Sequence, residues 1–138
     1  FYTNALIRFS ANQKGLKVVE KAIAKKWNDR LVRFYGESDF GENSHQLVIA
    51  EKWLKTKADS SVLFLTLARI SLRNEFTEKA KNYYKSSIDL SPSAEAYLEL
   101  SILLDREGDE DGSRENLKRY YKLIGIDSLN LPLVSYEI

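Results

Sequence analysis

Residues 61–92 read "SVLFLTLARISLRNEFTEKAKNYYKSSIDLSP", and this stretch decides the fold class. Apolar side chains recur at helical spacing over 61–73 and again over 77–90, and "NEF" interrupts them. The second segment stops at Pro92, and it carries the small residues Ala80 and Ser87 on either side of the bulky Tyr84. Because small side chains let another helix approach closely, we expect a helical hairpin packed between neighbours.

The same pattern returns after 33 residues. Big residues then align with big ones and small with small: Phe64 with Tyr97, Leu67 with Leu100, Ala68 with Ser101, Ala80 with Ser113, Tyr84 with Leu117, and Ile88 with Tyr121. The first copy resembles the tetratricopeptide pattern, which has an aromatic residue, then Leu-Ala, then Ala, Tyr and a closing Pro. It departs from that pattern at Ser71, where a tyrosine is favoured, and the second copy lacks the proline.

Helical periodicity dominates the rest of the chain up to residue 124. The predicted helices are 1–12, 15–27, 30–36, 44–57, 61–73, 77–90, 94–106 and 112–123. We therefore predict an all-α, tetratricopeptide-like right-handed superhelix of about four hairpins over 1–124, with the first repeat truncated. The tail 125–138 alternates Leu129, Leu131 and Leu133, which predicts an extended segment that caps the last hairpin or enters a neighbouring groove.

Composition excludes several classes of enzyme. The 138 residues contain no cysteine and one histidine, His45, so thiolate chemistry and two-histidine zinc sites are ruled out. The loop "REGDEDGS" resembles a calcium loop, but its twelfth position is Lys118 rather than glutamate. We interpret it as a turn whose Asp109, Glu110 and Asp111 begin the next helix. No catalytic residue, metal site or cofactor is predicted, and we expect the chain not to be an enzyme.

Charge is divided along the chain. Residues 1–58 carry a net charge of +5 and residues 59–138 a net charge of −4. Lys14, Lys17, Lys21 and Lys25 follow one another at helical spacing, which places them on one face. This face is either simply solvated or attracted to an anionic membrane or an acidic partner. No nucleic-acid motif accompanies it.

A second candidate surface follows from the repeats. Repeat arrays usually bind along the concave wall formed by the first helix of each pair. The residues predicted to face it, without a core to fill, are Leu65, Arg69, Leu72, Arg73, Leu98, Ile102 and Arg106. An apolar strip edged by arginines suits a partner segment with carboxylates. The alternative is that the leucines pack inside an irregular superhelix.

Three stretches resemble the C-terminal tetratricopeptide region of the bacterial HemY family: "WNDRLVRFYG" at 27–36, "AEKWL" at 50–54 and "LARISLRN" at 67–74. The resemblance implies a scaffold among enzymes of haem biosynthesis, held at the inner membrane by an N-terminal anchor. The chain starts at Phe1 and has no methionine, so we expect a piece of a longer protein, with the cytoplasmic side favoured. The alternative function is direct haem or porphyrin binding, through His45 or the arginines. Partner identity and oligomeric state stay open.

Overall fold

The computed structural model describes residues 2–125, with side chains from residue 12 onward. Seven helices lie within that range: α1 (Tyr2–Lys25), α2 (Asp29–Glu37), α3 (Asn43–Lys57), α4 (Ser61–Arg73), α5 (Thr77–Leu90), α6 (Ala94–Arg106) and α7 (Glu110–Leu123). They group into two compact units that divide at Leu90 and Ser91. The all-α prediction is confirmed, and the predicted tail lies outside the described residues.

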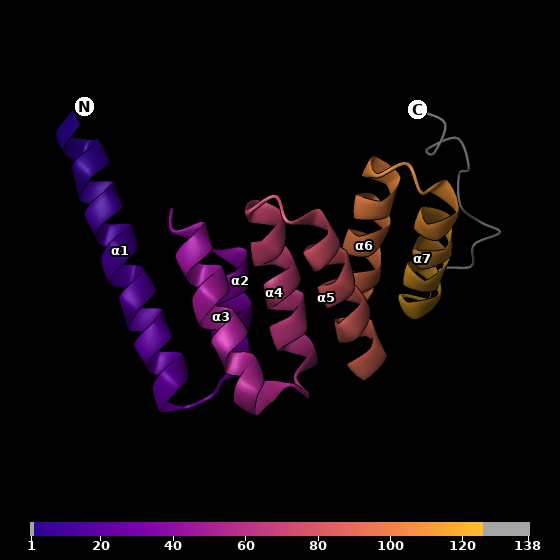
Figure 1. The fold of residues 1–138 in the computed structure, drawn as a ribbon, viewed down its shortest axis with the longest axis horizontal. Helices are drawn as coiled ribbons and strands as arrows, with labels where there is room; N and C mark the ends of the chain where they lie inside the picture. The colour runs from indigo at the N-terminus through magenta and orange to yellow at the C-terminus, as the bar shows by residue number, and fades with distance from the viewer. Residues whose placement is uncertain (1, 126–138) are drawn as a thin grey trace. The chain divides into compact units, whose positions relative to one another are not determined.

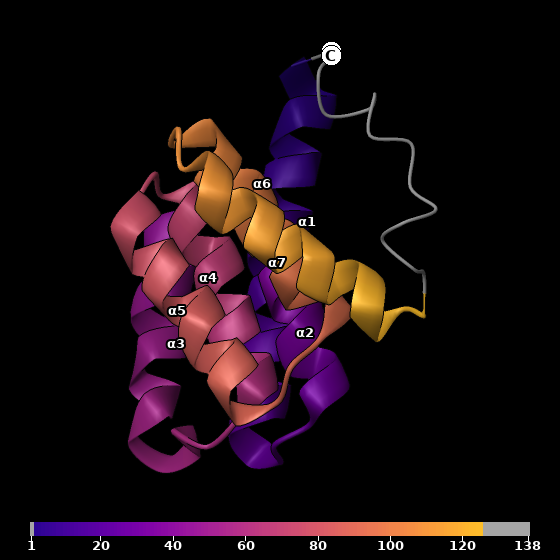
Figure 2. The same cartoon turned by 90° about the vertical axis from the view of Figure 1, so that its right-hand side faces the viewer.

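The first unit is built of neighbouring helices joined by short connections (Figure 1). Its core contains Leu16 and Ile23 of α1, Val32 and Tyr35 of α2, Leu47 and Ala50 of α3, and Leu63, Leu67 and Ile70 of α4, with Phe40 from the loop after α2. In the second unit, α6 and α7 form a hairpin (Figure 1), and Figure 2 views it with α7 in front.

The predicted break near residues 12–15 is wrong, because α1 runs without interruption from Tyr2 to Lys25. The sequence "NQKG" contains no proline, and one glycine in a helix costs only about 1 kcal/mol. The loop before α3 packs against this part of α1: Gln13 donates a hydrogen bond to Glu42 Oε1 at 2.6 Å, and Phe40 lies beside Gly15. Among the described residues, a single helix therefore takes the place of the first predicted hairpin.

Contact between α2 and α4 depends on a glycine. A Cβ at Gly36 would lie 2.9 Å from both Cα and Cγ2 of Thr66, which is closer than two non-bonded carbon atoms approach. Thr66 also donates a hydrogen bond from Oγ1 to the carbonyl oxygen of Val32, at 3.0 Å. Gly36 thus permits the close crossing, and Thr66 fixes it.

The hairpin that decided the fold class has the predicted packing. Ala80, Tyr84 and Ser87 of α5 are all buried. Ser87 donates a hydrogen bond from Oγ to the carbonyl oxygen of Ser61 in α4, at 2.9 Å. Ser87 is therefore a point at which the two helices meet, and the small Ala80 is fully buried.

Candidate functional site

Three helices meet around the carboxylate of Glu20. Tyr35 of α2 donates a hydrogen bond from its hydroxyl to Glu20 Oε2 at 2.5 Å, and His45 Nε2 of α3 lies 2.9 Å from the same oxygen. Tyr35 is fully buried, and burial first, then the bond to Glu20, raises its pKa well above the usual range. The neutral phenol is therefore a fixed donor that holds Glu20 of α1 against α2.

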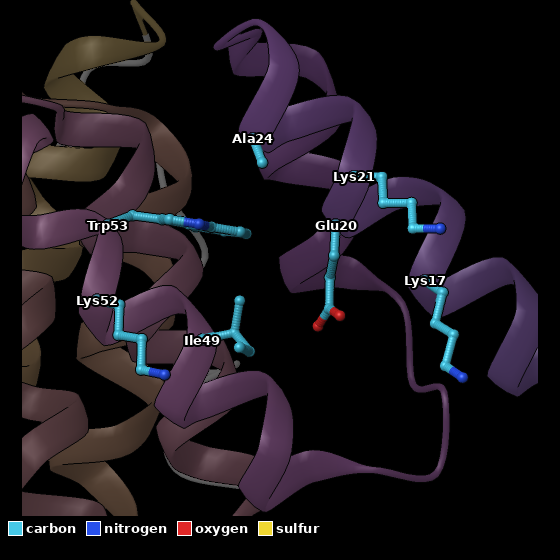
Figure 3. Close-up of a pocket in the computed structure, with 7 residues that line it drawn as sticks. All are labelled: Lys17, Glu20, Lys21, Ala24, Ile49, Lys52 and Trp53. Atoms are coloured by element: carbon cyan, nitrogen blue, oxygen red, sulfur yellow. The ribbon is translucent and has the colours of Figure 1, made fainter.

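A groove of about 580 Å³ opens beside this cluster, between α1 and α3. We call it the α1–α3 groove, and its lining residues are Lys17, Glu20, Lys21, Ala24, Ile49, Lys52 and Trp53. Figure 3 shows Trp53 and Ile49 projecting from α3 toward α1, with Glu20 directed into the space between the helices. The lysines lie at its edges. The groove thus has an apolar floor and a basic rim.

Aromatic packing holds the floor in place. The indole of Trp53 lies 5.1 Å from the ring of Tyr35 and 5.9 Å from that of Trp27, measured between centroids. Trp27 in turn donates a hydrogen bond to Asp29 Oδ1 at 3.0 Å, and Lys57 Nζ lies 5.4 Å from its ring centroid. Edge and tilted aromatic pairs add to the packing energy, so these contacts stabilise Trp53 in its place beside the groove.

The four lysines predicted to share one helix face do so on α1, and all four side chains are exposed. Lys17 and Lys21 line the groove, whereas Lys14 and Lys25 do not. Sequence reasoning missed the contribution of α3, namely Ile49, Lys52 and Trp53. The only sign of this contribution in the sequence was the spacing of apolar and basic residues in "IAEKW" at 49–53. That spacing does not indicate which helix faces α3 across the groove.

The structure places the seven predicted concave-wall residues in different environments. Leu65 is only 2% exposed, so the expectation that it lacks a core to fill is wrong. Leu72 and Leu98 are partly buried, and Ile102 and Arg106 are exposed. Since α4 and α6 belong to different units, the predicted wall residues are divided between the two units.

Arg73 has a structural environment that the sequence did not reveal. Its guanidinium donates to the carbonyl oxygens of Gly36 at 2.7 Å and Ser38 at 3.2 Å, and to Asn43 Oδ1 at 3.1 Å. Burial lowers the pKa of Arg73, and Arg69 adds to this effect. Arg69 pairs with Glu37 at 3.5 Å. Both arginines therefore join α4 to α2.

The calcium-like loop is a helix start, as predicted. Asp109 caps α7 by accepting a hydrogen bond on Oδ1 from the backbone N–H of Gly112, at 2.9 Å. Across residues 2–125, no group of three or more His, Asp or Glu side chains is placed to hold a metal ion. No helix in the same range is long and apolar enough to cross a membrane.

Comparison with solved structures identifies the fold. A crystal structure of MamA superposes with a TM-score of 0.66 at 16% sequence identity, covering 80% of this chain and 67% of that chain. MamA 41-end from Desulfovibrio magneticus RS-1 gives 0.64 at 16% identity, covering 86% and 70%. No protein-family model matches the chain, and neither does any curated protein. The chain thus shares an all-α, tetratricopeptide-like fold with MamA, and at this identity the likeness concerns the fold alone.

Proposed function

We propose that this chain is a protein-binding scaffold rather than an enzyme. The observation that carries the proposal is that large apolar side chains stand exposed on helices whose inner faces already form a packed core. Val18 of α1 is 66% exposed, Val48 of α3 is 54% and Ile102 of α6 is 46%. Side chains that the core does not need are available to a partner, and helical repeats bind proteins along such faces.

The predicted concave-wall residues remain part of this proposal on α6. Ile102 and Arg106 are exposed one turn apart, and the partly buried Leu98 precedes them by one turn. An apolar side chain beside a guanidinium suits a partner segment that carries a carboxylate. On α4, Leu65 is buried and Arg73 is bound by α2 and the loop after it, so neither is proposed to contact the partner.

We also propose, on the resemblance to HemY, that the partners are enzymes of haem biosynthesis at the bacterial inner membrane. Direct haem binding has weaker support. Nε2 of His45, one of the two ring nitrogens that can bind iron, already lies 2.9 Å from the Glu20 carboxylate. A saturable shift of the Soret band on adding haem, lost in His45→Ala, would favour that alternative.

Affinity capture from solubilised bacterial membranes, followed by mass spectrometry, tests the scaffold function. The informative variant is Ile102→Ser/Arg106→Glu, because both side chains are exposed and their loss leaves the core intact. Arg73 is unsuitable for this purpose, since its replacement would disturb α2. The charge-matched control is Arg114→Glu on α7, which is also exposed.

Partners that the wild type and the control capture, and that the double variant loses, would support the proposal. Haem-pathway enzymes among these partners would support the proposal that the scaffold binds enzymes of haem biosynthesis. Equal capture by all three proteins would place the binding surface elsewhere, and no specific capture at all would contradict the scaffold function.

A further inference from the structure

The α1–α3 groove has the composition of a recognition site, and it lies outside the predicted concave wall. We propose that it binds an acidic segment of a partner protein, with one apolar side chain seated on Trp53 and carboxylates facing Lys17, Lys21 and Lys52. The inference rests on the proposed scaffold function and gives that function a site and a partner chemistry.

The floor is suited to an apolar side chain before any ligand arrives. Trp53 is held between Tyr35 and Trp27, while Ile49 and Ala24 complete the apolar surface around it. A preformed pocket loses little conformational freedom on binding, so more of the contact energy appears as affinity. Aromatic side chains in such pockets are the residues that most often dominate binding.

Neither Lys17, Lys21 nor Lys52 forms an ion pair with another described residue. Two carboxylates on the same helices are engaged elsewhere. Glu20 is bound by Tyr35 and His45, and Glu51, the neighbour of Lys52, pairs with Lys79 at 3.0 Å and accepts the hydroxyl of Tyr83. Glu20 and Glu51 therefore hold the fold together rather than neutralise these lysines.

The shape of the site favours a polypeptide over a small anion. Its α1 wall extends from Lys17 to Ala24, which is about 10 Å along the helix. Exposed Val18 lies one turn from Lys21, and exposed Val48 lies one turn from Lys52, so apolar surface continues on both helices beyond the groove. A chain that alternates acidic and apolar residues can use this whole length.

Glu20 argues against an anionic membrane surface as the ligand. Its side chain is 16% exposed, and it points into the groove between the lysines (Figure 3). A uniform layer of phosphate headgroups would meet this carboxylate with like charge. A peptide can place its carboxylates at the lysines and an apolar or N–H group at Glu20.

The experiment starts from a random library of 12-residue peptides selected on the immobilised full chain. Selected peptides are synthesised with fluorescein, and their affinities are measured by fluorescence anisotropy at 0.15 M salt. The test variant is Lys17→Glu/Lys21→Glu. The matched control is Lys14→Glu/Lys25→Glu, which makes the same charge change on the same exposed face but outside the groove.

We expect the selected peptides to carry Asp or Glu on both sides of an aromatic or aliphatic residue. The test variant should weaken their binding on the order of 10-fold or more, because clustered lysines each contribute about a few-fold to tenfold in affinity. The control should weaken binding less than the test variant does, since Lys14 and Lys25 do not line the groove and each lie about one helical turn from a lysine that does. The NMR signal of the Trp53 indole N–H should shift on binding.

Selected peptides without acidic residues, or equal losses in both variants, would overturn the proposal. So would binding of phosphatidylglycerol vesicles that competes with the peptides and is lost in the test variant alone, because the ligand would then be a membrane. If peptide binding is lost only in Ile102→Ser/Arg106→Glu, the α1–α3 groove is not the binding site, but the scaffold function still holds. Selection of no peptide at all would contradict both.

Discussion

The α4–α5 and α6–α7 hairpins have nearly the same backbone at a spacing of 33 residues, yet they differ in burial. Ser60 and Ser93 cap the first helices by accepting from the N–H of Leu63 and Ala96, each at 3.1 Å. Both turns close with the same 2.9 Å bond, from Phe76 N to Ser71 O and from Asp109 N to Leu104 O. α5 nevertheless buries three side chains, and α7 buries none. Local sequence makes the hairpin, and tertiary neighbours decide what it buries.

The arginines at equivalent positions show the same lesson for polar groups. Arg73 and Arg106 both end the first helix of a hairpin. Arg73 donates three hydrogen bonds to α2, its following loop and α3, whereas Arg106 is exposed. A repeat alignment treats the two as the same residue. Only the presence of acceptors beside Arg73 separates them.

The largest difference in stability between the two hairpins is expected when an oversized side chain is placed in the second helix of each. Ala80→Trp places an indole where the native side chain is fully buried, so we expect a loss of about 3 kcal/mol in unfolding free energy. Ser113→Trp at the equivalent, partly buried position should cost less than about 1 kcal/mol. Chemical denaturation with amide hydrogen exchange measures both. Equal losses would mean that the two second helices are packed alike.

Replacing Arg73 or Arg106 with alanine should give the next largest difference in stability. Arg73→Ala leaves two backbone carbonyls without their charged donor, so we expect a loss of about 2–3 kcal/mol. Arg106→Ala should change stability by less than about 0.5 kcal/mol. Thermal unfolding of each variant against wild type checks this. A large effect of Arg106→Ala would show that the exposed arginine has a structural role.

Tyr83 gives the first hairpin a pH dependence that its counterpart Asn116 cannot supply. Burial, then the bond to Glu51, raises the pKa of Tyr83 above its unfolded value near 10. Its stabilising contribution is thus complete below about pH 10 and declines as pH rises further. Tyr83→Phe should cost about 1 kcal/mol at pH 7 and should flatten the decline above pH 10. Tyr35, whose pKa is also raised, is present in both the wild type and Tyr83→Phe. Urea denaturation of the two proteins from pH 7 to 11 therefore isolates the contribution of Tyr83.

The smallest effect is expected at the turns. Glu75 and Gly108 occupy equivalent positions with φ of 63° and 83°, the left-handed region that favours glycine. Gly108→Ala should destabilise the second hairpin by about 1 kcal/mol. Glu75→Gly should stabilise the first hairpin by up to about 1 kcal/mol. Part of this gain is offset because glycine raises the conformational entropy of the unfolded chain. If both substitutions change stability in the same direction, the two turns are not equivalent.

Much of the fold follows from the sequence because helix formation and capping are local. The apolar period, the serine caps, the turn residues and the 33-residue repeat placed α4 to α7 within two residues of their observed ends. α1 was the exception. Residues far along the chain, Phe40 and Glu42, pack on the part of α1 where the local pattern suggested a break.

The sequence by itself determined the helical hairpins, the face on which Lys14, Lys17, Lys21 and Lys25 lie, and the exclusion of cysteine chemistry. The tertiary structure decided that Lys17 and Lys21 stand opposite Trp53 and Lys52, that Arg73 joins α4 to α2, and that Leu65 is buried. The physical reason is that helical spacing fixes which residues share a face. It does not fix which other face that one meets, and pockets and charge partners arise only where two faces come together.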